Sequence, residues 1–250
     1  MSDKQPLIEP VQLSPPALAS LPIMHQRWEQ LAYFHWAYDP AEVQSHLPDG
    51  LTVDTFDGSA WVGLIPFEMR DIQFGRTPAI PHFGTFTEIN VRTYVVDAHG
   101  RRAIWFFSLD VPLASVTAAA RTIFGVPYCW SHTEHHVSGV HHHYTFDRQW
   151  PKPGTGVWAN ASIAFDVGAE IVEPSDFDHW MSARWALVSK RFGRLDYGRV
   201  FHPPWPLHEV ENVNINESAL RAAGLSAPHG PPHARYSPGV PVSLAWFERI

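Results

Sequence analysis

The stretch that decides the fold of this chain runs from Ile104 to Trp130 and reads IWFFSLDVPLASVTAAARTIFGVPYCW. Its first six residues are mostly apolar and aromatic, and they have the length of a buried strand. Ser115 is placed to cap a following helix of small residues. Gly125 then ends that helix, and Pro127 cannot continue it. The stretch therefore predicts a buried strand, a short helix and a sharp exit.

Composition limits the class of protein on either side of this stretch. The chain has 250 residues, of which 45% are hydrophobic and 17% charged, so it can bury a sizeable core. A net charge of −7 gives no electrostatic basis for binding nucleic acid or an anionic membrane. The single cysteine suits a reducing compartment, and no apolar run has the length of a signal peptide or a membrane helix. We therefore expect a cytoplasmic protein, and homo-oligomerisation stays open.

The remaining sequence reads as many short strands with a few short helices. Residues 1–22 are rich in proline and lack periodicity, which predicts an extended or partly disordered arm. Asp57-Gly58 between two apolar runs predicts a two-residue hairpin turn. No repeat or linker divides residues 23–250, so we expect one domain there. The pattern indicates an α+β protein that is mostly β, built as a barrel or a sandwich.

The strand expected around Phe86–Tyr94 has the clearest two-residue period. Branched apolar residues point to one face, whereas Glu88, Asn90 and Arg92 point to the other. In a small barrel, an inward polar face lines a ligand cavity. The alternatives are a solvent-exposed face and a buried structural ion pair. We take the three side chains as candidate ligand-binding residues.

Four segments together resemble the YqjF-like family of uncharacterised proteins (domain of unknown function 2071), which is related to the acetoacetate decarboxylase-like superfamily. They are MHQRWEQLAYFHWAYDPAEVQSHLPDGLTVDTFDGSAWVGLIPF from Met24, TFTEINVRTYV, SLDVPLASVTAAARTIFGVPY and HPPWPL. The resemblance implies a bent antiparallel β-barrel with an internal cavity and peripheral helices. It also implies that Glu88 lies where the decarboxylases have an active-site glutamate.

The resemblance fails at the residues that carry decarboxylase chemistry. In the decarboxylases a lysine pair follows the proline, and its first member forms a Schiff base; here the matching residues are Tyr128 and Cys129. A phenol cannot form an imine with a ketone. We therefore expect a protein that binds a small polar or carboxylate-bearing molecule in the cavity, with Tyr128 as a hydrogen-bond donor and with no cofactor. The alternative is a lysine-independent acid–base enzyme acting on a keto acid.

Three further residues are candidates for the ligand site. Arg184 lies between apolar neighbours in MSARWALV, and a buried arginine needs an anionic partner. Its partner is expected to be Glu88, another carboxylate or a ligand, and Glu88 is the preferred candidate. His202 and Trp205 belong to the proline-rich HPPWP segment and are expected to form a rigid wall, either of the ligand site or of a packed loop.

The densest histidine cluster is the stretch WSHTEHHVSGVHHHYTF. A turn at Ser138-Gly139 would place five side chains on one face of a hairpin: His132, Glu134, His136, His141 and His143. Cross-strand neighbours lie about 5 Å apart, a spacing compatible with a shared divalent metal. A metal-binding protein is thus a third hypothesis, weighed against a polar hairpin face with incidental metal affinity.

Overall fold

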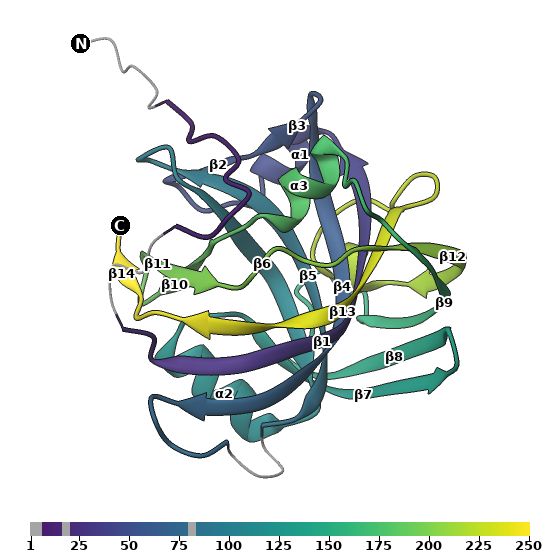
Figure 1. Ribbon diagram of the computed structural model, residues 1–250. Coiled ribbons are helices and arrows are strands. Elements are labelled where there is room, and N and C mark those ends of the chain that lie inside the picture. The colour runs from purple at the N-terminus through teal and green to yellow at the C-terminus, as the bar shows by residue number, and fades with distance from the viewer. Residues whose placement is uncertain (1–6, 17–20, 80–83) are drawn as a thin grey trace.

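The computed structural model describes residues 7–16, 21–79 and 84–250 (Figure 1). The four helices are α1 (Pro40–Gln44), α2 (Ala114–Ile123), α3 (Asp176–Ser182) and α4 (Ala219–Ala222). The strands are β1 (Met24–Tyr38), β2 (Leu51–Val53), β3 (Thr55–Phe56), β4 (Ser59–Phe74), β5 (Phe86–Asp97), β6 (Arg102–Val111), β7 (Tyr128–Ser138), β8 (His141–Trp150), β9 (Asn160–Glu170), β10 (Ala186–Arg191), β11 (Arg194–Phe201), β12 (His208–Glu217), β13 (His233–Leu244) and β14 (Glu248–Arg249).

The strands join into one large sheet that closes on itself. A first circuit runs β5-β6-β10-β11-β13-β1-β4 and returns to β5, because β11 pairs with β13 and β5 pairs with β6. A second circuit leaves β6 through β7, β8, β9 and β12 and rejoins at β13. The expected mostly-β, bent, barrel-like fold with peripheral helices is confirmed. The sheet is mixed rather than purely antiparallel, because β6 pairs in parallel with both β7 and β10.

Strands β1, β4 and β5 form a wall between two apolar cores. One face of the wall contributes Tyr33, Phe67 and Tyr94 to the core inside the first circuit. The opposite face contributes Phe34 and Leu64, among others, to a second core against β8 and β9. Every residue of β5 is therefore buried. The polar face of β5 looks into the first circuit, and the solvent-exposed alternative for that face is excluded.

The stretch from Ile104 to Trp130 forms most of β6, all of α2 and the start of β7. Helix α2 begins after Leu113, which makes no side-chain cap, so the expected cap at Ser115 is wrong; Ser115 lies one residue inside the helix. Gly125 ends the helical segment with φ +66°, as expected. A Cβ there would lie 2.8 Å from the Lys190 carbonyl oxygen. The crossover through α2 explains why β6 and β7 run in parallel.

The ordered part of the N-terminal arm packs on the β5–β6 turn without forming a helix or strand. The Glu9 backbone N–H donates to the Gly100 carbonyl at 2.9 Å, and Arg102 Nε donates to the Glu9 carbonyl at 2.8 Å. The Trp185 indole donates to the Gln12 carbonyl at 2.8 Å. Residues 1–6 and 17–20 of the expected arm lie outside the described residues. Among the described helices, none is long and apolar enough to cross a membrane.

Candidate ligand-binding site

A cavity of about 550 Å³ lies inside the first circuit of strands. Its walls come from β1, β4, β5 and β6 and from one face of α2. Most of the lining is aliphatic or aromatic, and the polar lining residues are Gln26, Glu88, Asn90, Arg92, Ser115 and Tyr128. A large apolar cavity with a few convergent polar groups has the usual character of a small-molecule site.

The register of β4 against β5 orders the polar groups along the cavity wall. Arg92 pairs with Gly63, Asn90 with Ile65 and Glu88 with Phe67. Alternate residues of a strand share a face, so the three polar side chains stand in a row. Toward the end of the row, Phe86 pairs with Met69, and β4 continues to Phe74. The predicted polar face therefore lines an internal cavity, with Tyr128 in contact with it.

Glu88 and Tyr128 form the first polar contact in the cavity. The Tyr128 hydroxyl donates a hydrogen bond to Glu88 Oε2 at 3.1 Å. Burial raises the pKa of Glu88 to about 8, and the negative charge of Asp110 adds to the rise, whereas hydrogen bonds from Tyr128 and Asn90 oppose it. Burial beside this carboxyl also raises the pKa of Tyr128 well above its usual value. At neutral pH the pair consequently holds protons that it can share with a ligand.

Arg92 supplies the second polar group, at the inner end of the row. Its side chain is buried, and its guanidinium carbon lies 5.5 Å from the ring centre of Tyr33 and 5.7 Å from that of Tyr94. Its Nη2 donates a long hydrogen bond, at 3.4 Å, to the Tyr94 hydroxyl. Among the described residues no carboxylate pairs with Arg92, and Arg92 Nε and Asn90 Oδ1 are buried without partners.

A buried histidine holds the Tyr94 hydroxyl on which Arg92 rests. The Tyr94 oxygen lies 2.6 Å from His35 Nε2, and their rings stack. Burial lowers the pKa of His35 well below its usual value, and the nearby positive charge of Arg92 acts in the same direction. His35 is therefore neutral, and it orients Tyr94 without neutralising Arg92.

The positions that carry decarboxylase chemistry hold no amine. The chain has three lysines; Lys152 and Lys190 are exposed and do not line the cavity, and Lys4 lies outside the described residues. Cys129 does not line the cavity, and its thiol contacts the Pro127 carbonyl. Burial raises the pKa of its thiol to about 12, so it is not a thiolate nucleophile at neutral pH.

Arg184 is a structural ion-pair residue, but its partner is not Glu88. Arg184 Nη1 donates to Asp54 Oδ2 at 2.6 Å, and Nε donates to the Trp180 carbonyl at 2.7 Å. Arg102 reaches the same oxygen of Asp54. Arg184 precedes β10 rather than lying within it, which turns its side chain toward the loop before β3 and away from Glu88. The preference for Glu88 as its partner is therefore wrong.

His202 and Trp205 lie behind the cavity. With Arg184 and Arg92 they line a separate space of about 20 Å³, too small for an organic ligand. Burial lowers the pKa of His202 to about 4, and its Nδ1 lies 2.8 Å from the Pro203 carbonyl oxygen. Trp205 packs on Tyr33 and Trp28. The packed-wall alternative fits these two residues better than direct contact with a ligand does.

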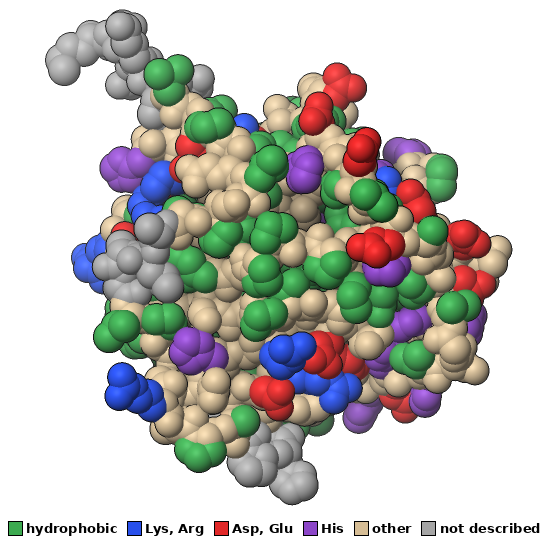
Figure 2. Space-filling view, in the orientation of Figure 1, with side chains coloured by type: hydrophobic (Ala, Val, Ile, Leu, Met, Phe, Trp, Pro, Cys, Tyr) green, Lys and Arg blue, Asp and Glu red, His purple; other side chains and the backbone are tan. Residues whose placement is uncertain are grey.

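The histidine hairpin is formed by β7 and β8, where Figure 2 shows histidines gathered at the right-hand edge. The turn is Gly139-Val140, one residue later than expected, because Gly139 takes φ +63° as the first turn residue. His136 therefore faces His143 instead of His141. The same five side chains still share a face, because the pairing shifts by two residues and alternate residues of a strand point to the same side.

These five side chains do not converge on a point. His136 contacts Glu134 at 3.4 Å, His141 contacts Asp166 at 2.8 Å and His143 contacts Ser162 at 2.9 Å. His132 pairs with Asp147 farther along the hairpin. Over residues 7–16, 21–79 and 84–250, no group of three or more histidine, cysteine, aspartate or glutamate side chains could hold a metal ion. The hairpin is a polar face of the sheet.

Three parts of the site were missed from the sequence. Asp54 lies between two short strands and carries no signal of its own. His35 and Gln26 lie on β1, where an alternation count along Met24–Tyr38 would have placed Gln26 on the cavity face. The small residues of α2 carry a signal as well: Ala119 and Ala120 follow Ser115 and Val116 by four residues each, so they lie on the same helix face and leave room for the cavity.

Sequence comparison finds similar proteins that cover most of this chain. The family of domain of unknown function 2071, described as an uncharacterised conserved protein, matches residues 25–241. An uncharacterised protein, YqjF of Bacillus subtilis (strain 168), is 30% identical over 216 residues, which cover 86% of this chain and 87% of that protein.

Solved structures with this fold have low sequence identity. An acetoacetate decarboxylase-like enzyme from Sphingomonas wittichii RW1 has a TM-score of 0.63 at 15% identity, covering 92% of this chain and 94% of that chain. The enduracididine biosynthesis enzyme MppR, complexed with pyruvate, has a TM-score of 0.61 at 13% identity, covering 93% and 92%. Acetoacetate decarboxylase from Legionella pneumophila has a TM-score of 0.59 at 13% identity, covering 94% and 92%.

Proposed function

This chain belongs to the YqjF-like family of uncharacterised proteins (domain of unknown function 2071), and from that premise we propose that it binds a small organic molecule bearing a carboxylate in its internal cavity, without Schiff-base chemistry. The absence of a lysine from the described cavity lining supports the second half of the proposal. The relative MppR was solved with pyruvate, a carboxylate, which agrees with the first half.

The observation that carries the proposal is the unpaired Arg92. A charge buried at 5% exposure costs several kcal/mol unless an anion compensates it. The aromatic rings of Tyr33 and Tyr94 offset only part of that cost. Because Arg92 lines the cavity, a ligand carboxylate can supply the missing charge and form the paired hydrogen bonds that a guanidinium favours. Asn90, with its unsatisfied Oδ1, adds an acceptor for a ligand hydroxyl or amine.

A second candidate function rests on the Glu88–Tyr128 pair. A carboxyl with a pKa of about 8 exchanges its proton near neutral pH, as a general acid or base must. The hydroxyl of Tyr128 can stabilise an oxyanion that forms beside it. The alternative is therefore an acid–base enzyme that acts on a bound keto acid or a related molecule without a lysine.

Calorimetric titration with matched acids and amides tests the binding proposal. The panel contains pyruvate, butyrate, hexanoate and decanoate, each with the corresponding primary amide. Hydrogen bonds to a charged group are worth about 1.5–3 kcal/mol, so the preferred acid should bind at least about tenfold more tightly than its amide. Arg92→Met should remove that preference, whereas Arg194→Met, at an exposed site on β11, should not.

Equal affinity for acids and amides would contradict the proposal, as would an acid preference that survives Arg92→Met. The enzyme candidate needs a separate measurement, because binding and turnover are different claims. Deuterium exchange at the carbon beside the carbonyl of a bound keto acid, lost in Glu88→Gln, would support it; a rate equal to that in buffer would eliminate it.

A further inference from the structure

The two polar contacts of the cavity lie far apart. Glu88 and Arg92 are four residues apart on one face of β5, and a strand rises about 3.3 Å per residue, so their Cα atoms are separated by about 13 Å. The Arg92 guanidinium packs over Tyr94, which lies farther along the strand from Glu88. A molecule as short as pyruvate cannot touch Arg92 and the Glu88–Tyr128 pair together.

Apart from Asn90, Gln26 and Ser115, the lining between and beyond these side chains is apolar. Ile65, Phe67 and Met69 contribute to it from β4, and Leu31 contributes to it from β1. Helix α2 covers another side with Val116, Ala119 and Ala120. None of these side chains can hydrogen-bond to a polar ligand. A polar group against these apolar side chains would lose its hydration without replacement, whereas an apolar body would gain from leaving water.

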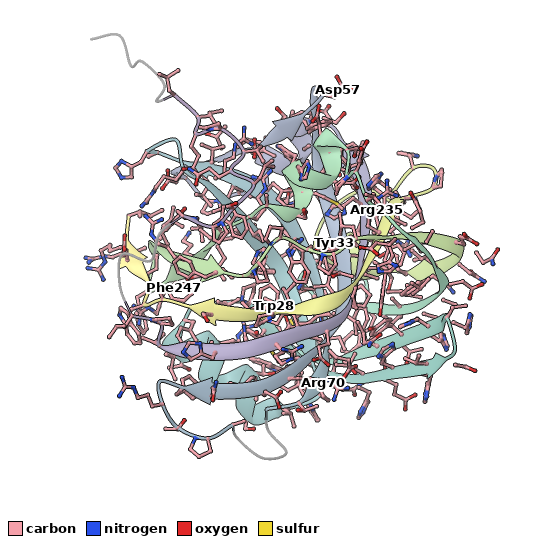
Figure 3. All side chains as sticks on the ribbon, in the orientation of Figure 1. Trp28, Tyr33, Asp57, Arg70, Arg235 and Phe247 are labelled. Carbon is pink, nitrogen blue, oxygen red and sulfur yellow. The ribbon has the colours of Figure 1, made fainter. Side chains whose placement is uncertain are left out.

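The mouth of the cavity is largely apolar. Three large hydrophobic residues of the lining are exposed there: Trp246 at 58%, Ile123 at 47% and Phe74 at 44%. Phe74 ends β4 and so lies beyond Phe86, at the opposite end of the row from Arg92. In Figure 3 Tyr33, which contacts Arg92, is near the middle of the molecule, and Phe247 of the lining is near its left edge. Arg92 and Tyr33 are buried, whereas the large apolar residues at the mouth are exposed, so the charged end of the cavity is the inner end.

We infer that the ligand is a monocarboxylic acid with a long apolar body, bound with its carboxylate on Arg92 and its body extending past Glu88 and Tyr128 toward Phe74 and Ile123. This inference rests on the proposed function and adds the class and direction of the ligand. In this position, Glu88 lies beside ligand atoms that are several carbons away from the ligand's carboxylate. Any proton transfer by Glu88 therefore occurs along the apolar body and not next to the carboxylate.

A homologous series of acids tests the inference with the intact chain. Affinities are measured for acetate, butyrate, hexanoate, octanoate and decanoate, with pyruvate for comparison. Each buried methylene should tighten binding about fourfold until the body reaches the mouth. Equal affinities along the series, or tightest binding by pyruvate or acetate, would overturn the inference. In that case, an acid preference that depends on Arg92 would still support the proposed function.

A cavity-filling variant on α2 checks that the body occupies the expected space. Ala120→Phe should weaken decanoate at least about tenfold while leaving butyrate within about twofold, because the added ring takes space that only the longer acid needs. Ala118→Phe is the matched control, since Ala118 is exposed on the same helix and does not line the cavity. Equal losses for both acids in Ala120→Phe, with the fold intact by circular dichroism, would contradict the inference.

Discussion

Arg92 and Arg184 are two buried arginines that differ in one respect. Both pack against Tyr94, with guanidinium carbons 5.7 Å and 4.5 Å from its ring centre. Arg184 has the carboxylate of Asp54, whereas Arg92 has none among the described residues. One charge therefore contributes to the fold, and the other is available for a ligand at the expense of stability, as is common at functional sites.

This difference predicts opposite effects of the same substitution. Arg184→Met should lower the free energy of unfolding by about 3 kcal/mol, because it leaves the buried Asp54 with Arg102 alone. Arg92→Met should leave stability unchanged or raise it by about 1 kcal/mol, because it removes an uncompensated charge. Urea unfolding of both variants measures the two values. A large loss in Arg92→Met would show that an unseen anion or contact already compensates that charge.

The correct partner of Arg184 is tested by a double-mutant cycle. Arg184→Met and Asp54→Asn should couple by at least about 1 kcal/mol, because each removes the same interaction. Arg184→Met and Glu88→Gln should be additive within about 0.5 kcal/mol, since the two side chains do not touch. Coupling with Glu88 and additivity with Asp54 would reverse the assignment.

Glu88 predicts a specific dependence of stability on pH. Its pKa is about 8 in the folded protein and 4.5 ordinarily. Between these values the folded state binds more protons than the unfolded state. The contribution of Glu88 to the free energy of unfolding is therefore fully present below pH 4.5 and is lost as the pH rises through 8. Glu88→Gln should thus become more stable relative to the native chain across that range, by at most about 1.4 kcal/mol per pH unit.

The comparison with Glu88→Gln isolates this group from the buried histidines. Burial lowers the pKa of His35 and His202, which destabilises the folded state at acid pH in both proteins equally. Glu248→Gln, at an exposed site on β14, is the control and should show no such trend. Parallel stability curves for the native chain and Glu88→Gln would contradict the raised pKa.

At the scale of the element, the segment from β6 to β7 depends on the bend at Gly125. A residue with φ near +66° is strained unless it is glycine, and a Cβ at this position would also meet Arg191 Cβ at 2.8 Å. Gly139 offers a matched case, with φ +63° and nothing within 4 Å of the added atom. Comparing substitutions at the two glycines therefore separates the cost of backbone strain from the cost of steric overlap.

Alanine at the two positions should therefore differ in its cost. Gly139→Ala should cost about 1 kcal/mol, from backbone strain alone. Gly125→Ala should cost about 3 kcal/mol, and it should also weaken ligand binding, because it displaces Tyr128 at the start of β7. Thermal unfolding and titration with the preferred acid measure both effects. Equal costs at both sites, with binding unchanged, would show that the bend does not position Tyr128.

The elements themselves were largely readable from the sequence, because their signals are local. The alternation along Phe86–Tyr94 gave the polar row, and the sequence around Gly125 and Pro127 gave the exit from α2. Local signals did not fix the first residue of α2 or the position of the β7–β8 turn, because neighbouring residues compete for each of these positions. Ser115 was a good cap by residue type, yet the helix starts after Leu113; the turn at Gly139-Val140 was displaced by one residue because glycine favours its first position.

At the scale of the whole molecule, the closure of the sheet makes the cavity. The first circuit closes where Val200 and Phe201 of β11 pair with Leu244 and Ser243 of β13, near the end of the chain. No local pattern specifies such a pairing. The contact between Arg184 and Asp54 joins residues 130 positions apart, which is why sequence analysis could require a carboxylate for Arg184 but chose the wrong one.

The charged surface around Arg70 contrasts with the buried Arg92. Around Arg70, labelled in Figure 3, basic and acidic side chains alternate on the face shown in Figure 2. Arg70 and Arg27 both contact Glu29 there. The charges around Arg70 are therefore compensated by their neighbours, whereas Arg92 inside the cavity has no carboxylate partner among the described residues.

The placement of the ligand in the cavity is tested most directly by a crystal structure with decanoate that carries a bromine atom on its terminal carbon. Anomalous scattering locates the bromine without reference to the rest of the density. We expect the carboxylate within hydrogen-bond distance of Arg92 and the bromine near Phe74 and Ile123, with the carbon chain passing Glu88. A bromine beside Tyr33 with the carboxylate at the mouth, or a ligand outside the cavity, would contradict this placement.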